Sequence, residues 1–128
     1  MIYIDTSVVL AQLLTEDKHP PSDFWAEHLV SSRLVEYEVW TRVNKVSARS
    51  DLLDATRGVL SRIALIELIP EVVARAKESF PVDVRTLDAL HLSSAAFLME
   101  QGVSLRLATY DTRMREAAKR VRLPLHAL

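Results

Sequence analysis

Two aspartates follow short segments that predict β-strands. Asp5 directly follows the run at residues 2–4, and Asp111 follows the run at residues 105–109. Ligand sites gather at the carboxyl ends of the strands in a parallel sheet. Each aspartate also precedes a predicted helix, where a carboxylate commonly only accepts backbone N–H bonds and complements the helix dipole. Their occurrence at two strand ends nevertheless favours a shared functional edge.

The apolar segment at residues 87–92 contributes a third aspartate and a histidine. Asp88 lies in the first turn of a predicted helix, a favourable place for a carboxylate on dipole grounds alone. On so apolar a helix it should be partly buried, and a buried charge needs a partner such as a cation. His91 has a side chain that can bind metals, but a lone histidine on an apolar helix is more often packed and hydrogen-bonded. We therefore expect a structural role for His91 and leave both interpretations of Asp88 open.

Two neighbouring glutamates flank the apolar stripe of another predicted helix. Glu36 and Glu38 lie on either side of the stripe that contains Val35, Val39 and Val46, so helical periodicity does not choose between them. A solvated border is the usual position of a glutamate on such a helix. The choice stays open at this point.

Carboxylates at one edge of a sheet are suited to holding a hard divalent cation. Mg²⁺ takes oxygen ligands and keeps several waters, so two or three carboxylates suffice to bind it. The bound ion lowers the pKa of a water molecule and neutralises charge that develops on a phosphodiester. Without a cation the carboxylates would repel one another. The chain has no cysteine, which excludes thiolate ligands, so the pattern predicts a Mg²⁺ or Mn²⁺ site.

Strands and helices alternate in the elements that must position these acids. Strands are predicted at residues 2–4, 63–69 and 105–109 and near Leu125. Helices are predicted up to Leu14, from Ser31-Ser32 to about Val46, and at residues 52–62, 72–79, 86–101 and 112–121, with an amphipathic segment at 22–30. The alternation predicts an α/β fold, a three-layer α/β/α sandwich around a short parallel sheet.

Length and composition predict one domain over residues 1–128. The chain is 49% hydrophobic and 26% charged, which suits a soluble protein with a buried core. No stretch approaches the roughly 20 apolar residues of a membrane span, and Asp5 interrupts the first apolar run, unlike a signal peptide. We therefore expect a cytoplasmic protein with no membrane association.

The charge of the chain is unevenly distributed. The formal net charge is only −1, which by itself gives no basic footprint for nucleic acid. The C-terminal part nevertheless concentrates six basic residues, Arg106, Arg113, Arg115, Lys119, Arg120 and Arg122. A solvated face is the ordinary explanation of such residues, and contact with phosphates is the alternative.

Four motifs taken together resemble the PIN-domain family. They are Asp-Thr-Ser at residues 5–7, Ser-x-Leu-x-x-x-Glu-Val at 32–39, Leu-Asp-Ala-Leu-His-Leu at 87–92 and Thr-Tyr-Asp at 109–111. Each is weak alone, but the ordered set is fairly specific and extends from Ile2 to about Leu123. The short chain is similar in length to VapC-type toxins of that family.

The resemblance assigns site residues one by one. The four acids of the family fall on Asp5, Glu38, Asp88 and Asp111, and three of them, Asp5, Asp88 and Asp111, are the implied metal ligands. Glu38 is chosen over Glu36 because Val39 follows it directly and Arg42 lies four residues on. Thr6 and Thr109 match hydroxyl positions that support the acids.

The function implied by the resemblance is that of a magnesium-dependent endoribonuclease. Such an enzyme hydrolyses RNA to 5′-phosphate and 3′-hydroxyl ends. A cognate antitoxin protein that inhibits the chain, and a homodimer, are implied in the same way.

Two other functions remain as alternatives. A receiver-type phosphoacceptor domain also places acids and Mg²⁺ at strand ends, but it needs paired acids after its first strand and a lysine after its last. Asp5 has no acidic neighbour, and no lysine follows the final predicted strand. A catalytically silent PIN-like interaction module is opposed only by the presence of all four acids.

Overall fold

A single parallel sheet forms the centre of the molecule. The computed structural model describes residues 1–14, 17–46 and 50–128. Its strands are β1 (Ile2–Ile4), β2 (Leu29–Ser32), β3 (Ile63–Ile66) and β4 (Arg106–Ala108), in the order β3-β2-β1-β4. All three pairings are parallel, and Tyr3 of β1 lies opposite Val30 and Leu107. β1 and β4 are therefore adjacent, which brings the residues after them together.

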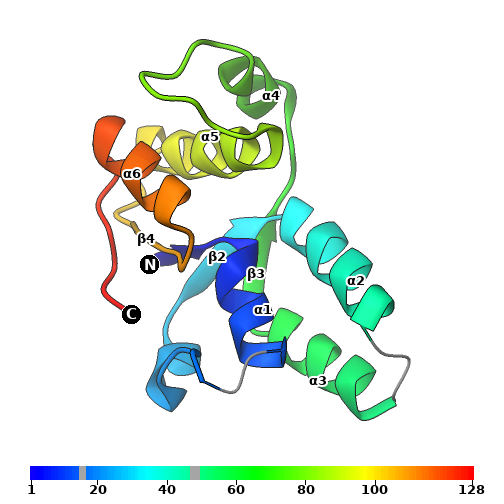
Figure 1. The fold of residues 1–128 in the computed structure, drawn as a ribbon. Helices are drawn as coiled ribbons and strands as arrows, with labels where there is room; N and C mark the ends of the chain where they lie inside the picture. The colour runs from blue at the N-terminus through cyan, green and yellow to red at the C-terminus, as the bar shows by residue number, and fades with distance from the viewer. Residues whose placement is uncertain (15–16, 47–49) are drawn as a thin grey trace.

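Helices cover both faces of this sheet (Figure 1). α1 (Thr6–Leu14), α2 (Leu34–Val46) and α3 (Ser50–Leu60) pack on one face, and α5 (Thr86–Glu100) and α6 (Thr112–Arg120) on the other. α4 (Pro70–Ala76) packs against α5, and η1 (Ser22–Ala26) is a short 3₁₀ helix. Ile2 and Ile4 enter one apolar core and Tyr3 enters the other, as the alternation of a strand requires. The predicted three-layer α/β/α sandwich is confirmed.

The central strand β2 is absent from the sequence-based prediction, which placed an amphipathic segment at residues 22–30 and a helix cap at Ser31-Ser32. The strand has only two apolar residues, so no alternation marks it. Its serines are buried but satisfied: Ser31 Oγ donates to the carbonyl of Ile4 at 2.6 Å, and Ser32 Oγ accepts from the Leu34 N–H at 3.1 Å. Ser32 thus ends the strand, and its side chain also supports the start of α2, in agreement with the helix cap predicted at Ser31-Ser32.

Three smaller predictions need correction. The segment near Leu125 makes one isolated parallel bridge with Leu107 and no strand. β3 ends at Ile66, and Pro70 begins α4 at the position where a proline costs no hydrogen bond. The buried stripe of α2 is Val35, Val39 and Val43, whereas Val46, at the last residue of the helix, is 57% exposed.

Within the described part of the chain, no helix is long and apolar enough to cross a bilayer.

Candidate active site

Asp5 and Asp111 lie side by side at the carboxyl ends of β1 and β4. Thr109 connects them, because its hydroxyl donates to Asp5 Oδ2 at 2.6 Å and accepts from the Asp111 N–H at 2.9 Å. The other oxygen of Asp5, Oδ1, accepts from the hydroxyl of Ser7 at 2.5 Å and from its N–H at 3.1 Å. Asp5 is 4% exposed, and burial raises its pKa against the opposing effect of these hydroxyl donors. Asp5 is therefore held in one orientation.

Asp111 caps helix α6, as expected of an aspartate at this place. Its Oδ1 accepts from the N–H groups of Arg113 at 2.8 Å and Met114 at 3.1 Å. Burial alone would raise the pKa of Asp111, but these N–H donors and the guanidinium of Arg85 outweigh it and lower the pKa. The cap uses one carboxylate oxygen and leaves Oδ2 turned towards Arg85. The structural and the functional interpretation of Asp111 are thus compatible.

Asp88 is partly buried and has a cationic partner from its own chain. Its side chain is 16% exposed, and its Oδ2 accepts from Nε of Arg85 at 2.9 Å. Nη2 of the same guanidinium pairs with Asp111 Oδ2. The apolar surroundings of Asp88 predict a cationic partner but do not identify it as Arg85. Its position three residues before Asp88 is the only signal, and that spacing is common on helix surfaces.

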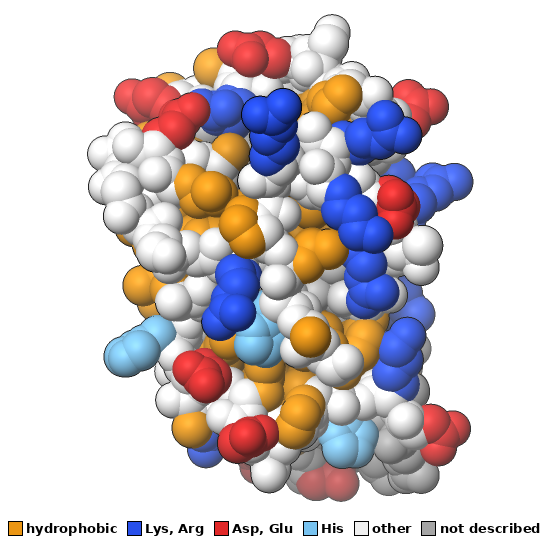
Figure 2. Space-filling view, turned by 90° about the vertical axis from the view of Figure 1, so that its left-hand side faces the viewer, with side chains coloured by type: hydrophobic (Ala, Val, Ile, Leu, Met, Phe, Trp, Pro, Cys, Tyr) orange, Lys and Arg blue, Asp and Glu red, His pale blue; other side chains and the backbone are white. Residues whose placement is uncertain are grey.

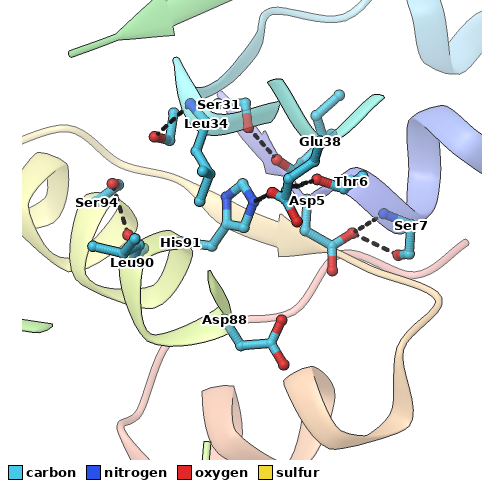
Figure 3. A network of polar contacts seen from close by, with 12 residues as sticks. Asp5, Thr6, Ser7, Ser31, Leu34, Glu38, Asp88, Leu90, His91 and Ser94 are labelled. Atoms are coloured by element: carbon cyan, nitrogen blue, oxygen red, sulfur yellow. Dashed lines mark hydrogen bonds and ion pairs between the residues drawn. The ribbon is translucent and has the colours of Figure 1, made fainter. Parts of the chain in front are cut away.

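Glu38 is held by a hydrogen-bonded chain that extends through His91 to Tyr3 of β1, and Figure 3 shows the part of it from Thr6 through Glu38 to His91. Glu38 Oε1 accepts from Thr6 Oγ1 at 2.7 Å and pairs with His91 Nε2 at 2.7 Å. His91 Nδ1 lies 2.8 Å from the Tyr3 hydroxyl, which accepts from the Ser32 N–H. Burial raises the pKa of Tyr3 far above its usual range, so this hydroxyl stays protonated. A carboxylate can only accept, so His91 Nε2 donates to Glu38 Oε1, and the Tyr3 hydroxyl can donate to Nδ1.

This arrangement separates the two glutamates of α2. Within the part of the chain that the structure describes, both contacts of Glu38 use Oε1, which leaves Oε2 for the site. Glu36 instead pairs with Arg33 at 2.8 Å, and Arg33 also binds Glu67, in an exposed group. The expectation of a packed, hydrogen-bonded His91 is confirmed, and its contact with Glu38 was not foreseen.

Removal of the Tyr3 hydroxyl should destabilise the protein. In Tyr3→Phe, the buried His91 Nδ1 and the Ser32 N–H each lose a partner, at a cost of about 1–3 kcal/mol in the free energy of unfolding. Urea denaturation measures this cost. Tyr37→Phe is the matched control, because Tyr37 is 67% exposed, and should change stability by less than about 0.5 kcal/mol. Equal midpoints for the two variants would show that the chain from Tyr3 to Glu38 does not contribute to stability.

The donor set of the four acids fits a hard cation. Asp5, Glu38 and Asp88 converge from β1, α2 and α5 on one region (Figure 3), and all of their donor atoms are oxygens. Among residues 1–14, 17–46 and 50–128, no three acidic or histidine side chains are already arranged as a metal-binding group. Asp88 and Asp111 share the guanidinium of Arg85, which shows that this edge accepts positive charge. A groove of about 550 Å³ adjoins it, lined by Val82, Asp83, Val84, Arg85, Thr112, Arg113 and Glu116.

Comparisons with known proteins show what the chain is similar to. A family model described as PIN domain matches residues 2–120. The chain is 38% identical to ribonuclease VapC46 of Mycobacterium tuberculosis over 127 residues, which cover 92% of this chain and 90% of the relative. It is 29% identical to ribonuclease VapC35 of the same species, over 99% of this chain and 96% of the relative. The crystal structure of PAE2754 from Pyrobaculum aerophilum superposes with a TM-score of 0.63 at 23% identity, covering 93% of this chain and 85% of that one, and shows the same fold.

Proposed function

The chain belongs to the PIN-domain family, and from this premise we propose that it is a magnesium-dependent endoribonuclease, the toxin of a VapBC-type toxin–antitoxin pair. The observation that carries the proposal is the placement of Asp5 and Asp111 at one sheet edge, where Thr109 joins them, with Asp88 linked to Asp111 through Arg85. The ribonuclease names of the two relatives support the choice of RNA as substrate.

The four acids divide into metal ligands and a water-orienting group. A divalent cation, Mg²⁺ or Mn²⁺, would be held by Asp5, Asp88 and Asp111, and when bound it supplies charge neutralisation and a more acidic water. Glu38 offers Oε2 as the atom that accepts a proton from the attacking water, because Thr6 and His91 hold its other oxygen. Thr109 and Ser7 fix the carboxylate of Asp5, so its orientation does not depend on the metal.

The surface beside the site suits an RNA backbone. The six basic residues of the C-terminal part are all exposed, and Figure 2 shows Lys and Arg side chains on the face that carries α6. Arg85 and Arg113 line a groove beside the site, and Arg85 also pairs with Asp88 and Asp111. Phosphate groups pair favourably with arginine and lysine, and such contacts need no net positive charge on the whole protein. A cognate antitoxin and a homodimer complete the proposal, on the family resemblance.

Divalent metal should stabilise the native protein. A cation that binds only the folded state at about 100 times its Kd adds about 2.7 kcal/mol, which corresponds to roughly 10 °C in melting temperature for a chain of this size. Melting curves with and without millimolar Mn²⁺ measure the effect. Asp5→Asn should lose most of it, since one ligand carries no charge.

This measurement also separates the enzyme from its rival. A catalytically silent PIN-like module, in which Arg85 permanently neutralises the acids, predicts melting curves that coincide with and without Mn²⁺. Coincident melting curves would contradict the proposal that the protein binds a divalent metal.

A further inference from the structure

Arg85 places a positive charge between two of the four acids. Its Nε donates to Asp88 Oδ2 at 2.9 Å, and its Nη2 pairs with Asp111 Oδ2. The two carboxylates come from α5 and from the cap of α6, and they are 16% and 25% exposed. A guanidinium stays charged at every physiological pH, and its planar set of donors can serve two carboxylates at once. Arg85 therefore offsets the repulsion that the acids would otherwise exert on each other.

We propose that Arg85 is a built-in counterion that occupies the cation position between Asp88 and Asp111, and that a divalent metal must displace it in order to bind. This inference rests on the proposed metal-dependent function. It adds that the two ion pairs of Arg85 lower the affinity of the protein for a divalent metal.

The oxygens that Arg85 uses are the ones a metal would need. On Asp111, Oδ1 is occupied by the cap of α6, so Oδ2 is the atom available to a cation. The same Oδ2 pairs with Arg85. On Asp88 the guanidinium also takes Oδ2. Because guanidinium and metal compete for these atoms, the free energy of the two ion pairs opposes metal binding.

Displacement of Arg85 needs no rearrangement of the fold. Its side chain is 54% exposed, so the guanidinium can return to water without opening the apolar core. Its backbone is anchored separately, because the Arg85 carbonyl accepts from the Ala89 N–H at 2.9 Å in the first turn of α5. The side chain can therefore leave while Asp88 stays in place.

The test is calorimetric titration of Mn²⁺ into the metal-free protein and its Arg85→Gln variant. Loss of two competing ion pairs should make the variant bind Mn²⁺ about fivefold more tightly, since exposed pairs contribute up to about 1 kcal/mol. Arg57→Gln is the matched control: Arg57 pairs with Asp54 at the same three-residue spacing, on α3, and its loss changes the net charge equally. The control should bind Mn²⁺ with the affinity of the parent.

A second readout is the stability of the metal-free proteins. Arg85→Gln should melt below Arg57→Gln without metal, because its carboxylates lose their counterion, and saturating Mn²⁺ should close this gap. If Arg85→Gln does not fold, Arg85→Lys takes its place. The lysine keeps the charge but loses the planar set of donors that pairs with both carboxylates, so its affinity for Mn²⁺ should still exceed that of the parent.

The outcomes distinguish this inference from the proposed function. Equal or weaker Mn²⁺ binding by Arg85→Gln, or by Arg85→Lys in its place, overturns the role of Arg85 and leaves the metal site intact. Absence of Mn²⁺ binding by every variant and by the parent overturns the metal site, and the inference with it.

Discussion

Replacement of Asp5 by Asn should reduce RNA cleavage by about 10²-fold to 10³-fold, because several kcal/mol of charge stabilisation are lost with the metal. The fold should survive. An amide oxygen can still accept the two bonds from Ser7, and the Thr109 hydroxyl can turn towards Ser7 Oγ, 3.3 Å away. Asp111→Asn should behave in the same way, because its amide oxygen can keep the cap of α6.

The assay uses one RNA substrate at saturating Mg²⁺, with circular dichroism as the test of folding. Asp54→Asn is the control, since Asp54 is exposed on α3 and should leave cleavage unchanged. Full activity of Asp5→Asn, with an unchanged circular dichroism spectrum, would refute the assignment of Asp5 as a metal ligand.

The second large effect is expected at Glu38. Glu38→Gln keeps an oxygen for Thr6 and His91 but replaces the free carboxylate oxygen by an amide, which cannot accept a proton from water. Loss of a positioned general base costs about 10²-fold or more. Glu36→Gln tests the neighbouring position, because it removes only an exposed pair with Arg33 and should change stability by less than about 0.5 kcal/mol.

Both glutamate variants can be compared on the same RNA under identical metal conditions. Loss of activity in Glu36→Gln together with full activity in Glu38→Gln would mean that the wrong glutamate has been placed in the site. Loss in both would indicate a requirement for the intact start of α2 rather than for one carboxylate.

The layered fold could be predicted because its signals are local. β1 is an apolar run directly followed by Asp5, β4 ends three residues before Asp111, and α5 and α6 begin and end within one or two residues of their predicted bounds. β2 could not be predicted, because the strand is four residues long and half of it is serine. Its stability comes from neighbours on both sides in the sheet, and such pairing over distance leaves no periodicity in the strand itself.

The sequence could predict the candidate residues of the site, but it could not predict the contacts between them. The strand ends pointed to Asp5 and Asp111, while Glu38 was selected over Glu36 only by the family resemblance. The contact of His91 with Glu38 joins residues 53 positions apart, and the ion pair of Arg85 with Asp111 joins residues 26 positions apart. Neither follows from the properties of a single helix, since both depend on how α2, on one face of the sheet, and α5 and α6, on the other face, come together at the edge where β1 and β4 end.

The chemistry of the RNA ends tests the central claim most directly. Water activated beside a metal leaves a 5′-phosphate and a 3′-hydroxyl, whereas attack by the ribose 2′-hydroxyl leaves a 2′,3′-cyclic phosphate and a 5′-hydroxyl. The purified chain should therefore give RNA fragments with 5′-phosphates in Mg²⁺, detected by ligation and sequencing, and no fragments once EDTA removes the metal. Fragments with 5′-hydroxyl ends, or cleavage that persists in EDTA, would contradict hydrolysis by a metal held on Asp5, Asp88 and Asp111.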